Sequence, residues 1–319
     1  MKILITGASG FVGGALMKMA SARAGWEVHG LGRRALPLPH YSRRDLESPL
    51  ELDFTPDLVV HAAARALPWG SPADFHRQNV LATQHVIDFC KRKGVPHLIY
   101  ISSSSVFYRE EDQEGITEQS PIGPDFVNHY SRTKYEGECL VRAFPGRSVI
   151  LRPRAVFGPG DTVLFPRLLA AARAGKMYRF ERKAAPARAD LIYIDTLCEY
   201  ILKAAVDPGI EGDFNLTNGQ PVEIESFLFG IFQRLDIPLP QKRLSCERAL
   251  KIATAIEWFY KLALPRREPP ITRFGIGVLA YSKTFDVAKS LAALGPPAVG
   301  LEEGVEAFLA WQKEQMHAP

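Results

Sequence analysis

Cysteine is scarce in this chain of 319 residues. The four cysteines are Cys90, Cys139, Cys198 and Cys246, and the closest two are 48 positions apart. Because no CxxC pair or cluster of metal-ligating residues occurs, the sequence excludes a disulfide-stapled scaffold and a zinc-finger type of site. We expect reduced thiols, no bound metal and a cytoplasmic location.

Long apolar runs and long runs of one charge are also missing. No stretch of about 18 apolar residues occurs, which excludes a membrane-spanning helix. The short run Ile3–Ile5 leads into a glycine loop and does not resemble a signal peptide. Lys and Arg number 39 against 35 Asp and Glu, a net charge of +4. The basic pairs are scattered, so we expect no nucleic-acid partner.

The chain does contain alternating strand-like and helix-like runs. Strands are predicted at 2–6, 26–31, 57–63, 97–103 and 147–151, and helices up to about 22 and at 73–93, 129–143, 163–174 and 195–206, with a loop over 106–128. This alternation predicts an α/β fold, a Rossmann-type doubly wound parallel sheet with helices on both faces. We predict one domain over 1–160, to which segments around 190–216 return, and a smaller C-terminal substrate-binding lobe over 161–319.

A glycine loop follows the first predicted strand. Residues 7–13 read Gly-Ala-Ser-Gly-Phe-Val-Gly and fit GxxGxxG. Glycines at this spacing permit a tight turn and close backbone approach to a pyrophosphate, and the helix N-terminus supplies oriented N–H groups. The alternative is an ordinary glycine turn, but the position after the first strand favours a dinucleotide site. The predicted contacts are Gly7, Ser9, Gly10, Phe11, Val12 and Gly13.

A second motif, YxxxK, occurs in the helix predicted at 129–143. Tyr130 and Lys134 are separated by four positions, so they share one face of a helix. A free tyrosine, with a pKa of about 10, is a poor base at neutral pH. A nearby ammonium is expected to lower that pKa, so that the phenol can exchange a proton with an alcohol or ketone.

Together these motifs resemble the extended short-chain dehydrogenase/reductases. The segment Ile101–Phe107 is similar to the serine segment of that family, and alignment on Val106 assigns the catalytic hydroxyl to Ser103. Ser104 and Ser105 are the alternatives within the serine run. The resemblance implies that Ser103 orients the reacting oxygen, that Tyr130 is the acid/base, and that Lys134 also binds the nicotinamide ribose.

Other segments resemble this family in the same order along the chain. They are His61-Ala62-Ala63, Asn79-Val80, Arg152–Asp161, Arg188–Asp195 and Phe214–Leu216. The resemblance implies further cofactor contacts at Ala62, Ala63, Asn79, Ser102, Pro153 and Val156, besides Tyr130 and Lys134.

The end of the second strand predicts which nicotinamide cofactor is used. A carboxylate there would bind the ribose 2′-hydroxyl of NAD, but the chain has Arg33 and Arg34. Arginine pairs well with a 2′-phosphate, so NADP(H) is favoured over NAD(H). The alternative is that both side chains face solvent. Asp45 and Leu46 resemble the adenine-contacting pair of the family, although Asp45 also suits a turn.

The likeness extends to the 3β-hydroxysteroid dehydrogenase branch of the family. Ala155 stands where many nucleotide-sugar enzymes have an asparagine that contacts the diphosphate. We therefore expect an apolar hydroxy or keto substrate, similar to a hydroxysteroid or a β-hydroxy acid. The alternative is a nucleotide-sugar epimerase, dehydratase or reductase, in which Arg179, Arg182, Lys183 and Arg188 would meet the diphosphate. A non-catalytic NADPH sensor is disfavoured by the intact Ser-Tyr-Lys set.

Two expectations concern surfaces. The apolar stripe within residues 249–264 is expected to face the core, with a substrate lid or a membrane-surface helix as alternatives. The family often pairs through the helix with YxxxK and the helix before the serine strand, here about 129–143 and 76–93. We therefore expect a homodimer joined by a four-helix bundle, with contacts from Leu81, His85, Val86, Cys139, Leu140 and Ala143.

Overall fold

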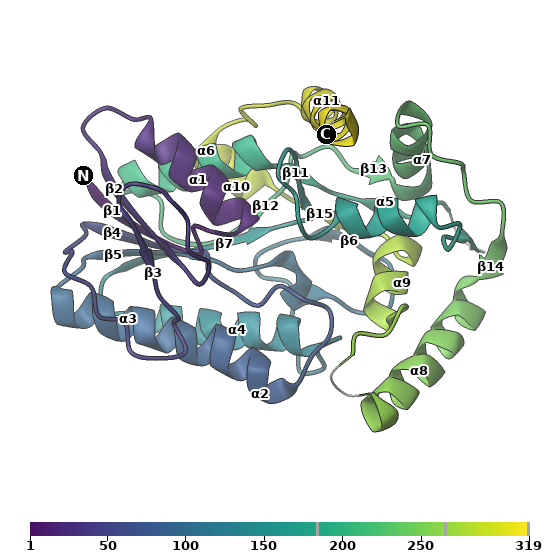
Figure 1. Cartoon of the computed structure of the whole chain (residues 1–319), viewed down its shortest axis with the longest axis horizontal. Coiled ribbons are helices and arrows are strands. Elements are labelled where there is room, and N and C mark those ends of the chain that lie inside the picture. The colour runs from purple at the N-terminus through teal and green to yellow at the C-terminus, as the bar shows by residue number, and fades with distance from the viewer. Residues whose placement is uncertain (183–184, 265–266, 318–319) are drawn as a thin grey trace.

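The core of the protein is a parallel sheet of seven strands (Figure 1). We describe it from a computed structural model, for residues 1–182, 185–264 and 267–317. The strands are β1 (Lys2–Thr6), β2 (Glu27–Gly32), β3 (Tyr41–Arg43), β4 (Leu58–His61), β5 (His97–Ile101), β7 (Arg147–Pro153) and β12 (Gly212–Leu216). Their spatial order is β12-β7-β5-β4-β1-β2-β3, so the direction of winding reverses between β1 and β4. Ligands of such sheets bind outside the carboxyl ends of the strands at this reversal.

Both faces of the sheet are buried, which explains why the strands read as continuous apolar runs. Ile3 and Ile5 belong to one core cluster, whereas Leu4 between them belongs to the other. Helices α1 (Phe11–Ser21) and α6 (Ile194–Val206) cover the first face, and α3 (Ala82–Lys93) and α4 (His129–Arg142) cover the second (Figure 1). The predicted doubly wound fold is confirmed.

The helix predicted over 73–93 is interrupted. It begins as α2 (Pro72–Phe75), continues as a π-helix over His76–Leu81, and ends as α3. A π-helical turn is uncommon and often occurs at functional sites. Here it contains Asn79, one of the predicted cofactor contacts.

A smaller lobe lies beside the carboxyl ends of the strands. Its sheet has the order β13-β10-β15-β6. The strands of the lobe and of the short pairs are β6 (Gln113–Ile116), β8 (Val156–Phe157), β9 (Arg179–Glu181), β10 (Arg188–Ala189), β11 (Ile192–Tyr193), β13 (Val222–Glu223), β14 (Arg243–Ser245) and β15 (Lys283–Phe285). The remaining helices are α5 (Phe165–Arg173), α7 (Ile224–Arg234), α8 (Cys246–Ala263), α9 (Arg273–Ala280), α10 (Ala288–Leu294) and α11 (Leu301–His317). The segment 106–128, predicted as a loop, contains strand β6. This strand pairs with β15, which is far away in sequence, so the local pattern does not predict it.

Helix α8 contradicts the expectation of a core-facing stripe. Only Ala249 and Ala253 on this helix are buried, and they allow a close approach to α9. The large side chains point outward instead: Ile252, Trp258, Phe259 and Leu262 are 46, 65, 53 and 66% exposed. Within the part of the chain that the structure describes, no helix is both long and apolar enough to cross a bilayer.

Candidate active site

The glycine loop connects β1 to α1 with the geometry of a phosphate cradle. Gly7 has a φ of +73°, and a Cβ there would lie 2.7 Å from the backbone nitrogen of Ala63. A Cβ at Gly13 would collide with the carbonyl oxygen of Gly7. The N-cap of α1 is Gly10, so no side chain caps the helix, and Phe11 and Val12 begin its first turn. The first backbone N–H groups of α1 therefore have no side-chain cap, and the glycines let a ligand approach the backbone closely. Both features suit a pyrophosphate.

Arg33 and Arg34 follow directly after β2, and both are exposed. The Arg34 guanidinium donates to the carbonyl oxygen of Ser9, which joins it to the glycine loop. The hydroxyl of Tyr41 donates to the Arg34 carbonyl oxygen over 2.5 Å. Among the described residues the Arg33 side chain has no ion pair. The guanidinium of Arg34 therefore lies at the glycine loop, and Arg33 is the next exposed cation along the chain.

The predicted adenine-contacting pair divides into an exposed and a buried residue. Asp45 is exposed, and its Oδ1 accepts from the backbone N–H of Glu47 at 3.1 Å, as a turn residue does. Leu46 is buried in the core cluster that contains Leu4. Leu46 therefore contributes to packing, while Asp45 is accessible from solvent.

Ala62 and Ala63 begin the loop after β4 (the β4 loop, residues 62–71), and Asn79 lies on the π-helix that follows α2. The backbone N–H of Ala63 donates to Thr6 Oγ1 at 3.1 Å. Asn79 is buried, accepts from the Arg65 backbone N–H at 2.7 Å and donates to Thr133 Oγ1 at 2.9 Å. Its amide therefore ties the β4 loop to the helix that contains Tyr130.

Tyr130 and Ser103 are brought together as the motifs predict. The side chain of Asn128 caps α4 by accepting from the Ser131 backbone N–H at 2.9 Å, which places Tyr130 in the first turn. The Ser103 side chain lies beside Tyr130, close enough to favour the ionised form of the phenol. Ser103 Oγ also accepts from the Ser105 backbone N–H at 3.2 Å. The serine that contacts the tyrosine is thus the one that the alignment selected.

Burial dominates the pKa values of Tyr130 and Lys134. Burial raises the pKa of Tyr130, although the neighbouring Ser103 side chain acts in the opposite direction. This shift is opposite to the predicted lowering by Lys134. Burial also lowers the pKa of Lys134 to about 7, against an opposing effect of Glu138. Lys134 Nζ donates to the Ile101 carbonyl oxygen at 2.5 Å and lies 4.3 Å from the centre of the Tyr100 ring.

Beneath these residues lies an ion-pair network that the motifs did not predict. Glu138 accepts from Arg152 through two bonds of 2.8 Å, and both side chains are fully buried. The hydroxyl of Ser102 donates to the same carboxylate at 2.6 Å. Ser102 is thus part of the network, rather than open to a cofactor. Tyr130, Lys134 and Glu138 are at i, i+4 and i+8, so they share one helix face. This spacing is the sequence feature from which the position of Glu138 could have been predicted.

The segment after β7 contains an unusual backbone position and an unpartnered cation. Pro153 ends β7, and Val156 begins β8 against β11. Ala155 has a φ of +44°, in the left-handed region that asparagine tolerates better than alanine. Arg154 is buried, its Nε has no hydrogen-bond partner, and the described residues offer its side chain no ion pair.

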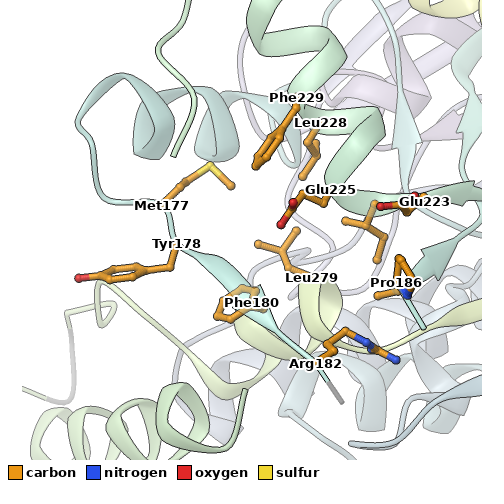
Figure 2. Close-up of a pocket in the computed structure, with 12 residues that line it drawn as sticks. Met177, Tyr178, Phe180, Arg182, Pro186, Glu223, Glu225, Leu228, Phe229 and Leu279 are labelled. Atoms are coloured by element: carbon orange, nitrogen blue, oxygen red, sulfur yellow. The ribbon is translucent and has the colours of Figure 1, made fainter. Parts of the chain in front are cut away.

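The lobe contains a cavity of about 240 Å³ (Figure 2). Figure 2 shows Phe180, Phe229 and Leu279 around it, from β9, α7 and α9. Two of the cations expected to meet a diphosphate are paired with carboxylates, and Arg182 and Glu225 themselves line this cavity. Arg179 pairs with Glu225 at 2.5 Å and Arg182 pairs with Asp112 at 2.7 Å.

Arg188 is exposed on β10, and within the described chain it has no ion pair. Lys183 lies outside the described residues.

Comparison with known proteins identifies the family of this chain. The chain is 32% identical to the 2-alkyl-3-oxoalkanoate reductase of Stenotrophomonas maltophilia, over 97% of this chain and 99% of that protein. It is 31% identical to the 3beta-hydroxysteroid-dehydrogenase/decarboxylase isoform 1 of Arabidopsis thaliana, over 78% of this chain and 61% of that protein. Among solved structures, MoeE5 in complex with UDP-glucose and NAD aligns with a TM-score of 0.75 and 23% identity, over 99% of this chain and all of that chain. This last likeness shows the fold.

The profile of the NAD dependent epimerase/dehydratase family matches residues 3–216. This match contains the glycine loop, the serine segment and YxxxK. The predicted extended short-chain type, an NAD(P)-dependent dehydrogenase/reductase, is confirmed at the level of the family. The chain belongs to the NAD dependent epimerase/dehydratase family.

Proposed function

We propose that this protein is a reductase of apolar ketones, or a dehydrogenase of the corresponding alcohols, that uses NADP(H). The observation that supports this function best is that Ser103 lies beside Tyr130, with Lys134 one helical turn further along. When bound, the nicotinamide would supply or accept the hydride at the carbinol carbon. The protein then has to orient the oxygen and transfer one proton.

Tyr130 is the proton donor in the proposed reduction. Because burial raises its pKa, the phenol is protonated at neutral pH and can donate to the oxygen of a ketone. The Ser103 hydroxyl would bond the same oxygen and stabilise the charge that develops there. Lys134 would supply positive charge beside the phenol and bind the nicotinamide ribose. Glu138 favours the charged form of Lys134, because it raises the pKa of that ammonium.

Three features favour an apolar substrate over a sugar nucleotide. Ala155 offers no side-chain donor, and Arg179 and Arg182 are neutralised by carboxylates. The cavity in the lobe has the apolar side chains of Phe180, Phe229 and Leu279 in its wall, beside the charged side chains of Arg182, Glu223 and Glu225. The relatives named for oxoalkanoates and hydroxysteroids support the same substrate class.

The preference for NADP(H) rests on the guanidinium groups of Arg33 and Arg34 at the end of β2. A 2′-phosphate there would meet two cations and no carboxylate. MoeE5, which shares the fold, was solved with NAD, so the fold by itself does not select NADP(H). The remaining proposed contacts are those of the glycine loop, Asp45, Leu46, the β4 loop, Asn79, Pro153 and Val156.

We also propose a homodimer in which α3 and α4 pair across a two-fold axis. Cys139 on α4 and Ala143, the residue that follows α4, are exposed, and Leu81, His85 and Leu140 are partly exposed. Val86 is fully buried against its own sheet, so its predicted place in the interface is wrong. The cytoplasmic location stays a prediction.

A nucleotide-sugar epimerase or reductase is the second candidate, because MoeE5 shares the fold and was solved with UDP-glucose. Absorbance of NADPH in the presence of 2-alkyl-3-oxoalkanoates, steroid ketones and UDP-glucose distinguishes the two. The proposal expects net oxidation of NADPH with the apolar ketones. Isomerisation of UDP-glucose without net NADPH oxidation, together with inactivity on every ketone, would overturn it.

A further inference from the structure

The outer face of α8 is an apolar stripe without a partner in this chain. Of the ten exposed large hydrophobic side chains in the described residues, four lie on this helix. Ile252, Phe259 and Leu262 are at i, i+7 and i+10, with Ala255 between them, so they form one line along the helix. Trp258 lies at the edge of this line and is 65% exposed. We name these five residues the α8 stripe.

Positive charge surrounds the α8 stripe. Arg248, Lys251 and Lys261 of the helix and Arg267 just beyond it are all exposed. In the described chain only Lys251 of these four has an acidic partner, Glu247 at 2.6 Å. Lys261 Nζ lies 5.8 Å from the centre of the Trp69 ring.

The neighbouring acids are used within the lobe. Glu257 accepts from the Arg273 backbone N–H at 2.8 Å, and Glu268 pairs with Arg167 at 2.5 Å. Within the described chain, Lys251 is neutralised by Glu247, whereas Arg248, Lys261 and Arg267 form no ion pair, so the surroundings of the α8 stripe remain cationic.

We propose that α8 binds the surface of an anionic phospholipid bilayer, lying in the plane of the interface. An amphipathic helix with aromatic and aliphatic side chains on one side and basic side chains around them has the features of an interfacial helix. Tryptophan is enriched at the boundary between headgroups and acyl chains, where Trp258 would lie. Basic side chains at its edges would pair with lipid phosphates.

Charge favours a bilayer over a second copy of this chain. In a two-fold contact the same surface faces itself, so the cations around the stripe would approach one another. An anionic surface removes this repulsion and covers the apolar line at the same time. The C-terminal end of α8 also lies near the active site, because Lys261 contacts Trp69 and acts electrostatically on His129, the neighbour of Tyr130. An apolar substrate would thus have a short path from the lipid.

Co-sedimentation with vesicles tests this proposal. The full-length protein is mixed with vesicles of phosphatidylcholine containing phosphatidylglycerol, and with vesicles of phosphatidylcholine alone. We expect binding to the anionic vesicles, at least about tenfold weaker binding to the neutral ones, and weakening by high salt. The emission of Trp258 should shift to shorter wavelength on binding, and Trp258→Phe should remove most of that shift.

Two sets of variants identify the surface. Phe259→Ser with Leu262→Ser should reduce binding to anionic vesicles at least about tenfold, because both side chains would lie in the acyl region. Arg248→Gln with Lys261→Gln should reduce the preference for anionic lipid while retaining the fold. Val206→Ser with Leu291→Ser is the matched control, since these side chains are exposed on other helices, and it should bind as wild type does.

Three results would overturn the proposal. They are no sedimentation with anionic vesicles, equal binding to both kinds of vesicle, and binding unaffected by the change at Phe259 and Leu262. If that double variant instead halves the mass in light scattering, and wild type does not bind vesicles, the stripe is a contact between copies and not a lipid surface.

Discussion

Glu138 and Arg152 form a fully buried, two-bonded ion pair directly beneath the residues proposed to transfer the proton. Glu138 lies one helical turn beyond Lys134 and opposes the lowering of the Lys134 pKa. Asp213 accepts from Arg152 at 2.6 Å, so the guanidinium bridges α4, β7 and β12. The network therefore contributes to the stability of the sheet and also favours the charged form of Lys134.

Glu138→Gln should destabilise the protein strongly, because it leaves Arg152 buried with only Asp213 to balance its charge. Breaking one side of a buried pair typically costs about 3–5 kcal/mol, and urea unfolding measures this loss. The pH profile of kcat should also shift toward lower pH, since Lys134 loses the carboxylate that favours its charged form. Glu136→Gln, on the exposed side of the same helix, is the control; equal stability losses in both variants would contradict this role.

Lys134→Met should change how stability depends on pH. In the folded chain the Lys134 pKa is about 7, below its usual value of 10.5, so between these values the unfolded chain binds a proton that the native chain does not. Wild-type stability therefore gains a contribution as pH rises through this window, on the order of a few kcal/mol, and the variant lacks it. Urea unfolding from about pH 6 to about pH 9 should show a smaller rise for the variant. If the free energy of unfolding of the two proteins rose equally with pH, the pKa of Lys134 would not be strongly lowered in the folded chain.

Arg33→Ala and Arg34→Ala should weaken NADPH binding more than NADH binding. A charge-assisted contact with phosphate is worth roughly 1.5–3 kcal/mol, so we expect about a tenfold or greater rise in the Kd for NADPH. Fluorescence titration of both cofactors measures this difference, with Arg44→Ala as the control. If wild type prefers NADH, or if both cofactors weaken equally, these residues do not select NADP.

Leu81→Arg should separate the proposed dimer. Leu81 is partly exposed at the end of the π-helix, where a new cation would lie in the α3–α4 contact. Light scattering of wild type should give about twice the 35.4 kDa of one chain, and the variant should approach one chain. Leu291→Arg, on a different exposed surface, should remain a dimer. A monomeric wild type would refute the interface.

The sequence predicted those parts of the fold and site that depend on neighbours along the chain. The strand, glycine loop and helix around Gly7 are local, and so is the helical spacing of Tyr130 and Lys134. Strand β6 was missed because it exists only through pairing with β15, far away in sequence. The outward orientation of the α8 stripe was not predicted, because an apolar stripe in the sequence does not show whether it packs on the protein core or faces outward. The raised pKa of Tyr130 depends on burial by the whole fold.

Tyr130→Phe tests the central claim most directly, with turnover measured as NADPH oxidation by a 2-alkyl-3-oxoalkanoate. The variant lacks only the hydroxyl, so NADPH binding should stay close to wild type while kcat falls at least about a hundredfold. Tyr135→Phe, on the same helix, should remain active. A Tyr130→Phe protein that kept a tenth or more of the wild-type kcat would contradict the assignment of Tyr130 as the proton donor.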